Sequence, residues 1–366
     1  MEIYISLLII SLLASFLLRK SKLVGIIFII LLFFISASRG ERVGLDTENY
    51  YNNVFSSFYE GETHKLEFLF IGFCDFIRDN GLNSRCCVYL LSFLTFLFVY
   101  LSARRFHVNI TIVCFFYLLF LYFTHSLCIA RQMAACSILL FAYSFLFEDI
   151  KTVGERGHKI KNIAYFLLFA LLATSIHSGA FLGFLVIVVY FLQKRITIIY
   201  NNLKCSPLTV FLVLFVSFAV IQLFRNTLLS EFQGILAIID MYEGYTTVER
   251  AISLFGFLYN SIVFLFHAYV LVYLFKTGDN KLATFFLVSL FLRIFLTAFN
   301  GAIYRLIFYF SIIDIIVYSK CFLYLSSRSR IVFWMALLYF GVDYVLVLVN
   351  NPYETVPYVF KMIEIL

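Results

Sequence analysis

Hydrophobic residues follow one another in long stretches that short polar segments separate. A helix needs about 20 apolar residues, with a range of roughly 17–25, to cross a bilayer. The pattern therefore predicts an all-α polytopic integral membrane protein with about twelve transmembrane helices, or roughly 10–12 given that several stretches are short. The predicted spans lie near residues 3–18, 23–38, 86–103, 110–127, 131–147, 163–176, 178–193, 207–224, 251–275, 282–299, 302–318 and 331–349.

The block 163–193 has two interpretations: one long tilted helix, or two short helices that meet at "SIHSG". Most of the 28 Lys and Arg residues lie in alternate loops of the twelve-span arrangement, which places those loops in the cytoplasm. Only a break at His177 keeps the later cation-rich loops on that side. The two longer polar loops, 39–85 and 225–250, and both termini then face outward. The predicted cytoplasmic loops are 19–22, 102–109, 148–162, 193–204, 276–281 and 319–330.

Each outer loop contains a short stretch with an amphipathic pattern. The segment "LEFLFIGFCDFI" (66–77) and the segment "GILAIIDMY" (234–242) predict helices at the outer interface. No internal repeat and no low-complexity linker divides the chain. We therefore expect a single transmembrane domain over residues 1–366.

Composition excludes a soluble protein. The chain is 63% hydrophobic and 13% charged, whereas soluble chains carry about 25% charged residues. The net charge of +7 does not indicate nucleic-acid binding, because the cations are scattered over short loops. None of the eight Cys forms a C-x-x-C pair, and we do not expect a disulfide among Cys74, Cys86 and Cys87.

Ionisable residues inside the predicted spans are costly and therefore informative. Six of them fall in the outer half of their spans, whereas Asp314 lies nearer the cytoplasmic side. Arg39 and Asp46 begin the first outer loop at the same depth. The pattern predicts a polar cavity that is open to the outer face and contains three arginines. The six residues are His125, Arg131, His177, Arg293, Arg305 and Asp343.

These residues also have structural interpretations. His125 and Arg131 lie near a helix turn, where an arginine can snorkel to the headgroups. Arg293 could pair with a buried acid such as Asp343, and His177 could be a hydrogen-bonded turn residue. In "GLDTENYY", Asp46 has the pattern of a helix N-cap that follows a glycine turn.

Three arginines at headgroup depth suit a diphosphate, because guanidinium binds phosphate oxygens in pairs and stays protonated. The sequence has no D-x-D pair, no phosphate-binding glycine loop, no G-x-S-x-G and no HExxH. We therefore expect no metal and no cofactor. A donor used at the outer face must arrive already activated, as a lipid diphosphate is.

Four motifs in order resemble the EpsG-type polysaccharide polymerases, which are related to the Wzy O-antigen polymerases. The matching residues are Arg39, Gly44, Asp46, Tyr50, Arg131, His177, Arg305 and Tyr309; Arg293 is added from its depth alone, and Arg42 leaves open which arginine of the first motif matches. The motifs are "SRGERVGLDTENY", "ARQMAACSILL", "ATSIHSGAFLGF" and "YRLIFYF".

The resemblance implies a GT-C-like membrane glycosyltransferase of the bacterial inner membrane with its active site facing the periplasm. Its donor and acceptor would be oligosaccharide repeat units on undecaprenyl diphosphate, and a chain-length regulator in the same membrane would be its partner. Arg131, Arg305 and Arg293 would bind the diphosphate, with Arg39, Tyr50 and Tyr309 around the substrate. His177 or Asp46 would be the general base.

Two other membrane functions compete with a polymerase. A flippase for lipid-linked oligosaccharides would also carry arginines in a cavity, but its charges should lie in both halves of the membrane. An O-antigen ligase shares the donor and the chemistry, and only the motifs argue against it.

Overall fold

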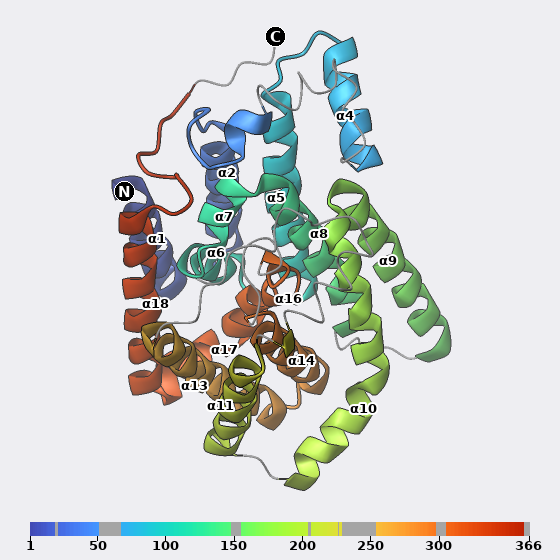
Figure 1. The fold of residues 1–366 in the computed structure, drawn as a ribbon, viewed down its shortest axis with the longest axis vertical. Coiled ribbons are helices and arrows are strands. Elements are labelled where there is room, and N and C mark those ends of the chain that lie inside the picture. The colour runs from blue at the N-terminus through green and yellow to red at the C-terminus, as the bar shows by residue number, and fades with distance from the viewer. Residues whose placement is uncertain are drawn as a thin grey trace. The chain divides into compact units, whose positions relative to one another are not determined.

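The computed structural model describes residues 1–18, 21–50, 67–147, 155–203, 206–225, 227–228, 254–297 and 305–361. The chain divides into two compact units, one formed by Met1–Phe184 with Tyr318–Leu366 and the other by Leu185–Val317. The described parts of both are helical, and their labels appear in Figure 1.

The first unit contains most of the described helices, and three of them form its best-packed part. Helices α5, α8 and α9 lie side by side, and phenylalanine rings from all three contact one another. Phe141 of α8 contacts Phe98 of α5 and Phe169 of α9, with ring centroids 5.6 and 4.8 Å apart. The helices are α1 (Glu2–Leu17), α2 (Lys22–Ala37), α4 (Phe68–Asp79), α5 (Cys86–Arg105), α6 (Ile110–Leu119), α7 (Tyr122–Cys128), α8 (Ala130–Phe147), α9 (Glu155–Ile176) and α18 (Arg330–Asn350).

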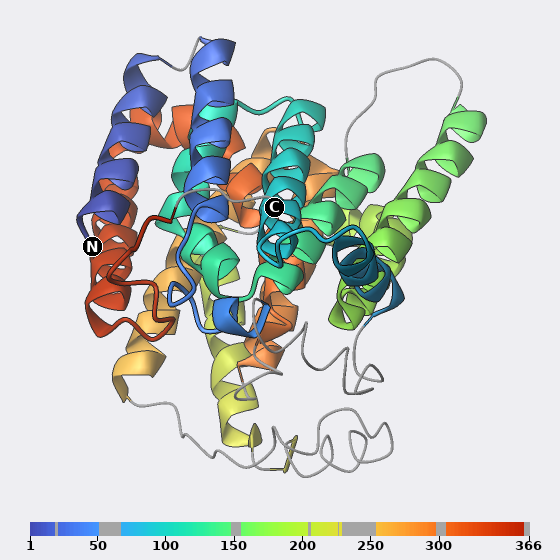
Figure 2. The same cartoon turned by 90° about the horizontal axis from the view of Figure 1, so that it is seen from above.

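Helix α1 runs antiparallel to α18, and Figure 2 shows the two side by side. Phe16, near the end of α1, contacts Phe333 near the start of α18, with ring centroids 6.0 Å apart. At the other end the Tyr344 hydroxyl donates to the Tyr4 carbonyl at 3.2 Å. Residues beyond α18 then return along the loop that follows α2. The hydroxyl of Tyr4 on α1 donates to the carbonyl of Thr355 in this returning segment at 2.7 Å.

The second unit contains α10, α11, α13, α14 and α16, together with the first residues of α17. Ser206 caps α11 through the Thr209 amide, and Pro207 occupies the first helical position, where its missing amide proton costs no hydrogen bond. The bounds are α10 (Val186–Leu203), α11 (Pro207–Leu223), α13 (Leu254–Lys276), α14 (Asn280–Leu296), α16 (Phe308–Ser311) and α17 (Asp314–Arg328).

The described residues contain six helices that are long and apolar enough to cross a membrane, or seven if α6 and α7 form one broken span. The bend between α6 and α7 is 67°, and Leu121 at the break has φ +64°. Four shorter apolar helices accompany them: Glu2–Leu17, Lys22–Ala37, Ile160–Ile176 and Pro207–Leu223. A multi-pass membrane protein is confirmed, whereas twelve crossings and a GT-C-like architecture stay predictions.

Several predicted boundaries were wrong because helices continue past their apolar stretches. The predicted loop 319–330 lies mostly inside α17, and 193–204 lies mostly inside α10. Arg328 falls in the last turn of α17, where a cation is favourable beside the free carbonyl groups of a helix end. An apolar stretch therefore marks the part of a helix that contacts lipid or core, and it underestimates the length of the helix.

Two local predictions are confirmed. The chain breaks at His177, between α9 and the 3₁₀ helix η3 (Ser178–Leu185). Residues 68–79 form the amphipathic helix α4, which buries Phe70, Cys74 and Ile77 on one face at helical spacing. The other predicted interfacial helix, 234–242, lies outside the described residues.

Candidate active site

The first motif folds around Arg39, which lies just beyond α2 and is fully buried. Its Nη1 donates to the Ser36 carbonyl at 2.8 Å, and its Nε donates to Thr47 Oγ1 at 3.0 Å. Thr47 Oγ1 in turn contacts the carbonyl oxygens of Val43 and Leu127 at 2.7 and 3.2 Å. Arg39, expected at the substrate, thus organises the loop from inside.

Gly44 brings this loop against the junction between α7 and α8. Its φ is +89°, and a Cβ at this position would lie 2.1 Å from the carbonyl oxygen of Leu127. Only glycine fits both the left-handed backbone and this close approach. A helical turn then begins at Thr47, as the N-cap pattern of Asp46 predicts, and the Tyr50 amide donates to the Asp46 carbonyl at 3.2 Å.

Arg131 is the second residue of α8 and meets two other segments of the first unit, the start of α4 and the loop that ends at Tyr50. Its Nη1 donates to Glu67 Oε2 at 2.8 Å, and its guanidinium lies over the ring of Phe70, 4.9 Å from the centroid. Its main-chain amide points to the Tyr50 hydroxyl at 3.4 Å. The Arg131 side chain is 22% exposed. We call Tyr50, Glu67, Phe70, Arg131 and the Ser178 amide the Arg131 cluster.

Electrostatics within the loop connect Tyr50 with both charged neighbours. Burial raises the pKa of Tyr50; the positive charge of Arg131 opposes that rise, and the negative charge of Asp46 adds to it. The Tyr50 hydroxyl therefore stays protonated and neutral. Asp46, Tyr50 and Arg131 are three predicted site residues that this unit brings within electrostatic reach of one another.

Glu67 links the cluster to the break after α9. Its Oε1 accepts from the Ser178 amide at 2.6 Å, while its Oε2 accepts from Arg131. One carboxylate therefore binds the guanidinium and the start of η3 at once. His177, half-buried, immediately precedes Ser178, so the predicted base lies next to the cluster along the chain.

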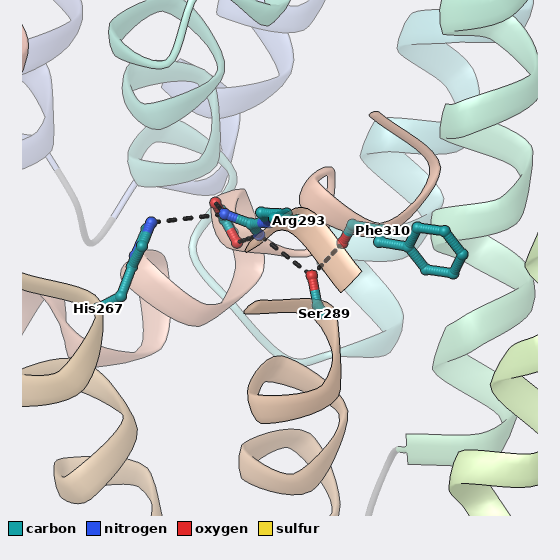
Figure 3. Close-up of polar contacts among 5 residues, drawn as sticks. His267, Ser289, Arg293 and Phe310 are labelled. Atoms are coloured by element: carbon teal, nitrogen blue, oxygen red, sulfur yellow. Dashed lines mark hydrogen bonds and ion pairs between the residues drawn. The ribbon is translucent and has the colours of Figure 1, made fainter. Parts of the chain in front are cut away.

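A second polar cluster lies inside the other unit, where Figure 3 shows Arg293 between three partners. Its guanidinium forms a two-point ion pair with Asp314, with Nη1 to Oδ2 at 2.6 Å and Nη2 to Oδ1. Nη2 also donates to Ser289 Oγ at 3.2 Å, and Nη1 lies 3.4 Å from His267 Nε2. Ser289 Oγ donates to the Phe310 carbonyl at 3.0 Å.

The pairing with Asp314 corrects the expected depths. The sequence assigned Asp314 to the inner half and Arg293 to the outer half, and it offered Asp343 as the acid that could pair with Arg293. In the structure Asp314 lies at the start of α17, directly against the guanidinium. The predicted span 302–318 put Asp314 near the end of a helix. In the structure a helix, α17, begins at Asp314, so the expected depth of this residue was wrong.

The comparisons with known proteins bear on the whole chain. The EpsG family model matches residues 22–360. The chain belongs to the EpsG family. No curated protein and no solved structure matches the chain. The resemblance inferred from the four motifs is thus confirmed, and the EpsG family indicates a polysaccharide polymerase of the Wzy type acting in a membrane.

The four EpsG-like motifs of this EpsG-family protein are divided between the two units. The first three meet in one unit, at the loop 39–50, the start of α8 and the break at His177. The fourth lies in the other unit, where Arg305 is exposed and Tyr309 is fully buried. The roles of Arg305 and Tyr309 at the substrate stay predictions.

Sequence reasoning missed three residues of these clusters. Glu67 lies in the segment predicted as an interfacial helix, Asp314 was placed nearer the cytoplasmic side, and His267 is not among the predicted site residues. A search for the acid partner of each arginine within a span could have found Glu67 and Asp314, because a buried guanidinium needs one. No signal in the sequence singles out His267.

Proposed function

We propose that this EpsG-family protein joins oligosaccharide repeat units that arrive on undecaprenyl diphosphate, at the periplasmic face of the bacterial inner membrane. Membership of the EpsG family over residues 22–360 carries the proposal. The Arg131 cluster supports a place for the donor: its guanidinium is partly exposed, lies at the start of a helix and binds a carboxylate. A diphosphate oxygen makes the same kind of contact.

The reaction transfers the glycan from its lipid to a new unit. The bond between the anomeric carbon and the diphosphate oxygen breaks, and the electron pair leaves with the lipid diphosphate. A hydroxyl at the non-reducing end of the second unit forms the new bond and loses its proton. Arg131 stabilises the charge that develops on the leaving diphosphate, and the sequence predicts Arg305 as a second ligand.

The proton of the acceptor hydroxyl passes to a base near Arg131. Asp46 and His177 are the two candidates, and we favour His177, because Asp46 already begins the helical turn at Thr47. The proposal requires no metal ion, since the positive charge of arginine serves the leaving group. Polymerisation by the purified protein should continue in EDTA, and a requirement for Mg²⁺ or Mn²⁺ would contradict this.

The decisive experiment separates charge from geometry at Arg131. In a deletion strain, Arg131→Lys should be present in the membrane at the normal amount, while the ladder of long chains collapses to single units. Lysine keeps the charge but cannot make the planar two-point contact. A lost contact to a charged group costs about 1.5–3 kcal/mol, or roughly 10- to 150-fold in rate.

Matched substitutions complete this experiment. Arg104→Lys is the control, because Arg104 is exposed at the end of α5 and donates to the Tyr100 hydroxyl of its own helix at 3.4 Å. Its ladder should be normal. Arg305→Lys and His177→Ala should each lose the ladder, His177→Ala with donor binding preserved. A normal ladder from Arg131→Lys would show that this arginine only anchors α8.

A further inference from the structure

An apolar groove of about 440 Å³ lies between α4 and α5 in the first unit. This volume is within the usual range of ligand sites, about 300–1,000 Å³. Among the residues that the structure describes, no charged or polar side chain lines the groove, and Phe68 and Phe76 at α4 are 74% and 56% exposed. The lining residues are Phe68, Leu69, Phe70, Gly72, Phe73, Phe76, Leu90, Leu91, Leu94 and Ile176.

The groove adjoins the Arg131 cluster through two of its own residues. Phe70 lines the groove and also carries the guanidinium of Arg131 on its ring, 4.9 Å from the centroid. Ile176 lines the groove and is followed by His177 and Ser178, whose amide binds Glu67. The apolar groove therefore adjoins a cation, Arg131, and a main-chain donor, the Ser178 amide.

Glu67 occupies the anion position at that end. Its two oxygens accept from Arg131 Nη1 at 2.8 Å and from the Ser178 amide at 2.6 Å. The Nε of Arg131 is buried and has no hydrogen-bond partner among the described residues. The site therefore has donor capacity beyond what one carboxylate uses, and a diphosphate has more oxygens and more charge to use it.

We propose that the α4–α5 groove binds the first isoprene units of the polyprenyl diphosphate donor, whose diphosphate replaces the Glu67 carboxylate on Arg131 and the Ser178 amide. This inference rests on the proposed function. It assigns the lipid part of the donor to the α4–α5 groove and the diphosphate to Arg131 and the Ser178 amide. The occupant follows from the arrangement of charge. A long hydrocarbon chain with an anion at one end matches a groove whose described lining is apolar and which adjoins an arginine through Phe70.

Glu67 acts in this proposal as a competing anion. In this structure its carboxylate pairs with Arg131 and with the Ser178 amide at the start of η3, and such pairing is favourable because an unpaired buried charge is costly. Donor binding must displace it. Removing the charge of Glu67 therefore raises donor affinity, which is the opposite of what removing a substrate ligand does.

The test uses the purified full-length protein and a polyprenyl diphosphate with a diazirine on its first isoprene units. Illumination should label peptides that contain residues 68–76 and 90–94. Glu67→Gln should raise the labelling at low probe concentration by roughly tenfold in apparent affinity, the size of one charged contact. Glu67→Asp keeps the charge and should stay near the wild type.

A second pair of variants tests the groove itself. Leu94→Trp fills it from α5 and should reduce labelling at residues 68–76 by at least roughly tenfold, as loss of a buried apolar contact does. Leu97→Trp, on the same helix but outside the lining, is the control and should label normally.

Three results would overturn the inference. Labelling that phosphatidylglycerol competes away as well as unlabelled polyprenyl diphosphate would make the groove a general lipid site. Unchanged or weaker labelling of Glu67→Gln would remove its role as competitor. A wild type that polymerises but is not labelled in the groove would refute the groove alone, whereas a wild type that forms no polymer from lipid diphosphate units would refute the proposed function.

Discussion

Replacing Asp314 by Asn, with Arg293 left in place, is expected to destabilise the protein strongly. Both side chains are buried, with residue exposures of 9% for Arg293 and 5% for Asp314. The substitution leaves a buried guanidinium beside a neutral amide. Removing one partner of such a pair costs about 3–5 kcal/mol, which is a large part of the about 5–15 kcal/mol that holds a protein domain folded.

A doubly neutral variant separates the possible roles of the pair. Arg293→Met combined with Asp314→Leu removes both charges together, and replacing a buried ion pair by apolar residues is often neutral or stabilising. If the pair only joins α14 to the start of α17, this variant should be stable and should make a normal ladder. If Arg293 also binds the donor, the variant should be stable and make no long chains.

The assay is the monodisperse fraction of detergent-solubilised protein after heating, together with the polysaccharide ladder in a deletion strain. The control is Asp75→Asn, because Asp75 and Arg78 form a partly exposed ion pair at 2.7 Å on α4. Such pairs contribute about 0–1 kcal/mol. Asp314→Asn as stable as Asp75→Asn would refute the buried pairing, and a double variant as unstable as the single one would refute the compensation.

Three further predictions concern the first unit. Gly44→Ala should lower stability by about 1–3 kcal/mol through backbone strain, measured by thermal unfolding, because its Cβ would meet a main-chain carbonyl at 2.1 Å. A mild thiol oxidant should link Cys74 to Cys87, whose sulfurs are 3.5 Å apart; mass spectrometry that found another pair would contradict the packing of α4 on α5. The hydrogen bond from Lys361 lowers the pKa of Glu41 below 4.5. The stabilisation that this ion pair gives the folded protein is therefore present above pH 4.5 and is lost as the pH falls further. Lys361→Ala should lower the thermal unfolding midpoint slightly at pH 7 and should not lower it at low pH.

The sequence predicted what depends on local pattern. Apolar stretches located the helices, the alternating loop charges favoured the break at His177, and helical spacing identified α4. The motif order correctly indicated the EpsG family. These features follow from residues close together along the chain.

The hydrogen-bond and ion-pair partners of the charged side chains could not be predicted in the same way. Glu67 and Arg131 are separated by 64 positions, and no local pattern records that the carboxylate also binds the Ser178 amide. Arg39 was expected at the substrate from its motif and its depth, and in the structure it is fully buried and donates to Ser36 at the end of α2 and to Thr47. The membrane depth of a residue, counted along a predicted span, is wrong where the observed helix begins and ends at other residues, as for Asp314.

The residues after α18 have a consequence for the order in which the protein is made. Main-chain hydrogen bonds join Gly40 to Val359 and Gly44 to Glu354, and Lys361 binds Glu41 across 320 positions of sequence. The first motif is synthesised early, but the residues 354–361 that hydrogen-bond to it are synthesised much later. During translation this loop therefore lacks the contacts that shape it until the last residues are made. A polypeptide stopped before residue 354 would contain every predicted catalytic residue, but its first-motif loop, which includes Asp46, would lack these C-terminal hydrogen bonds.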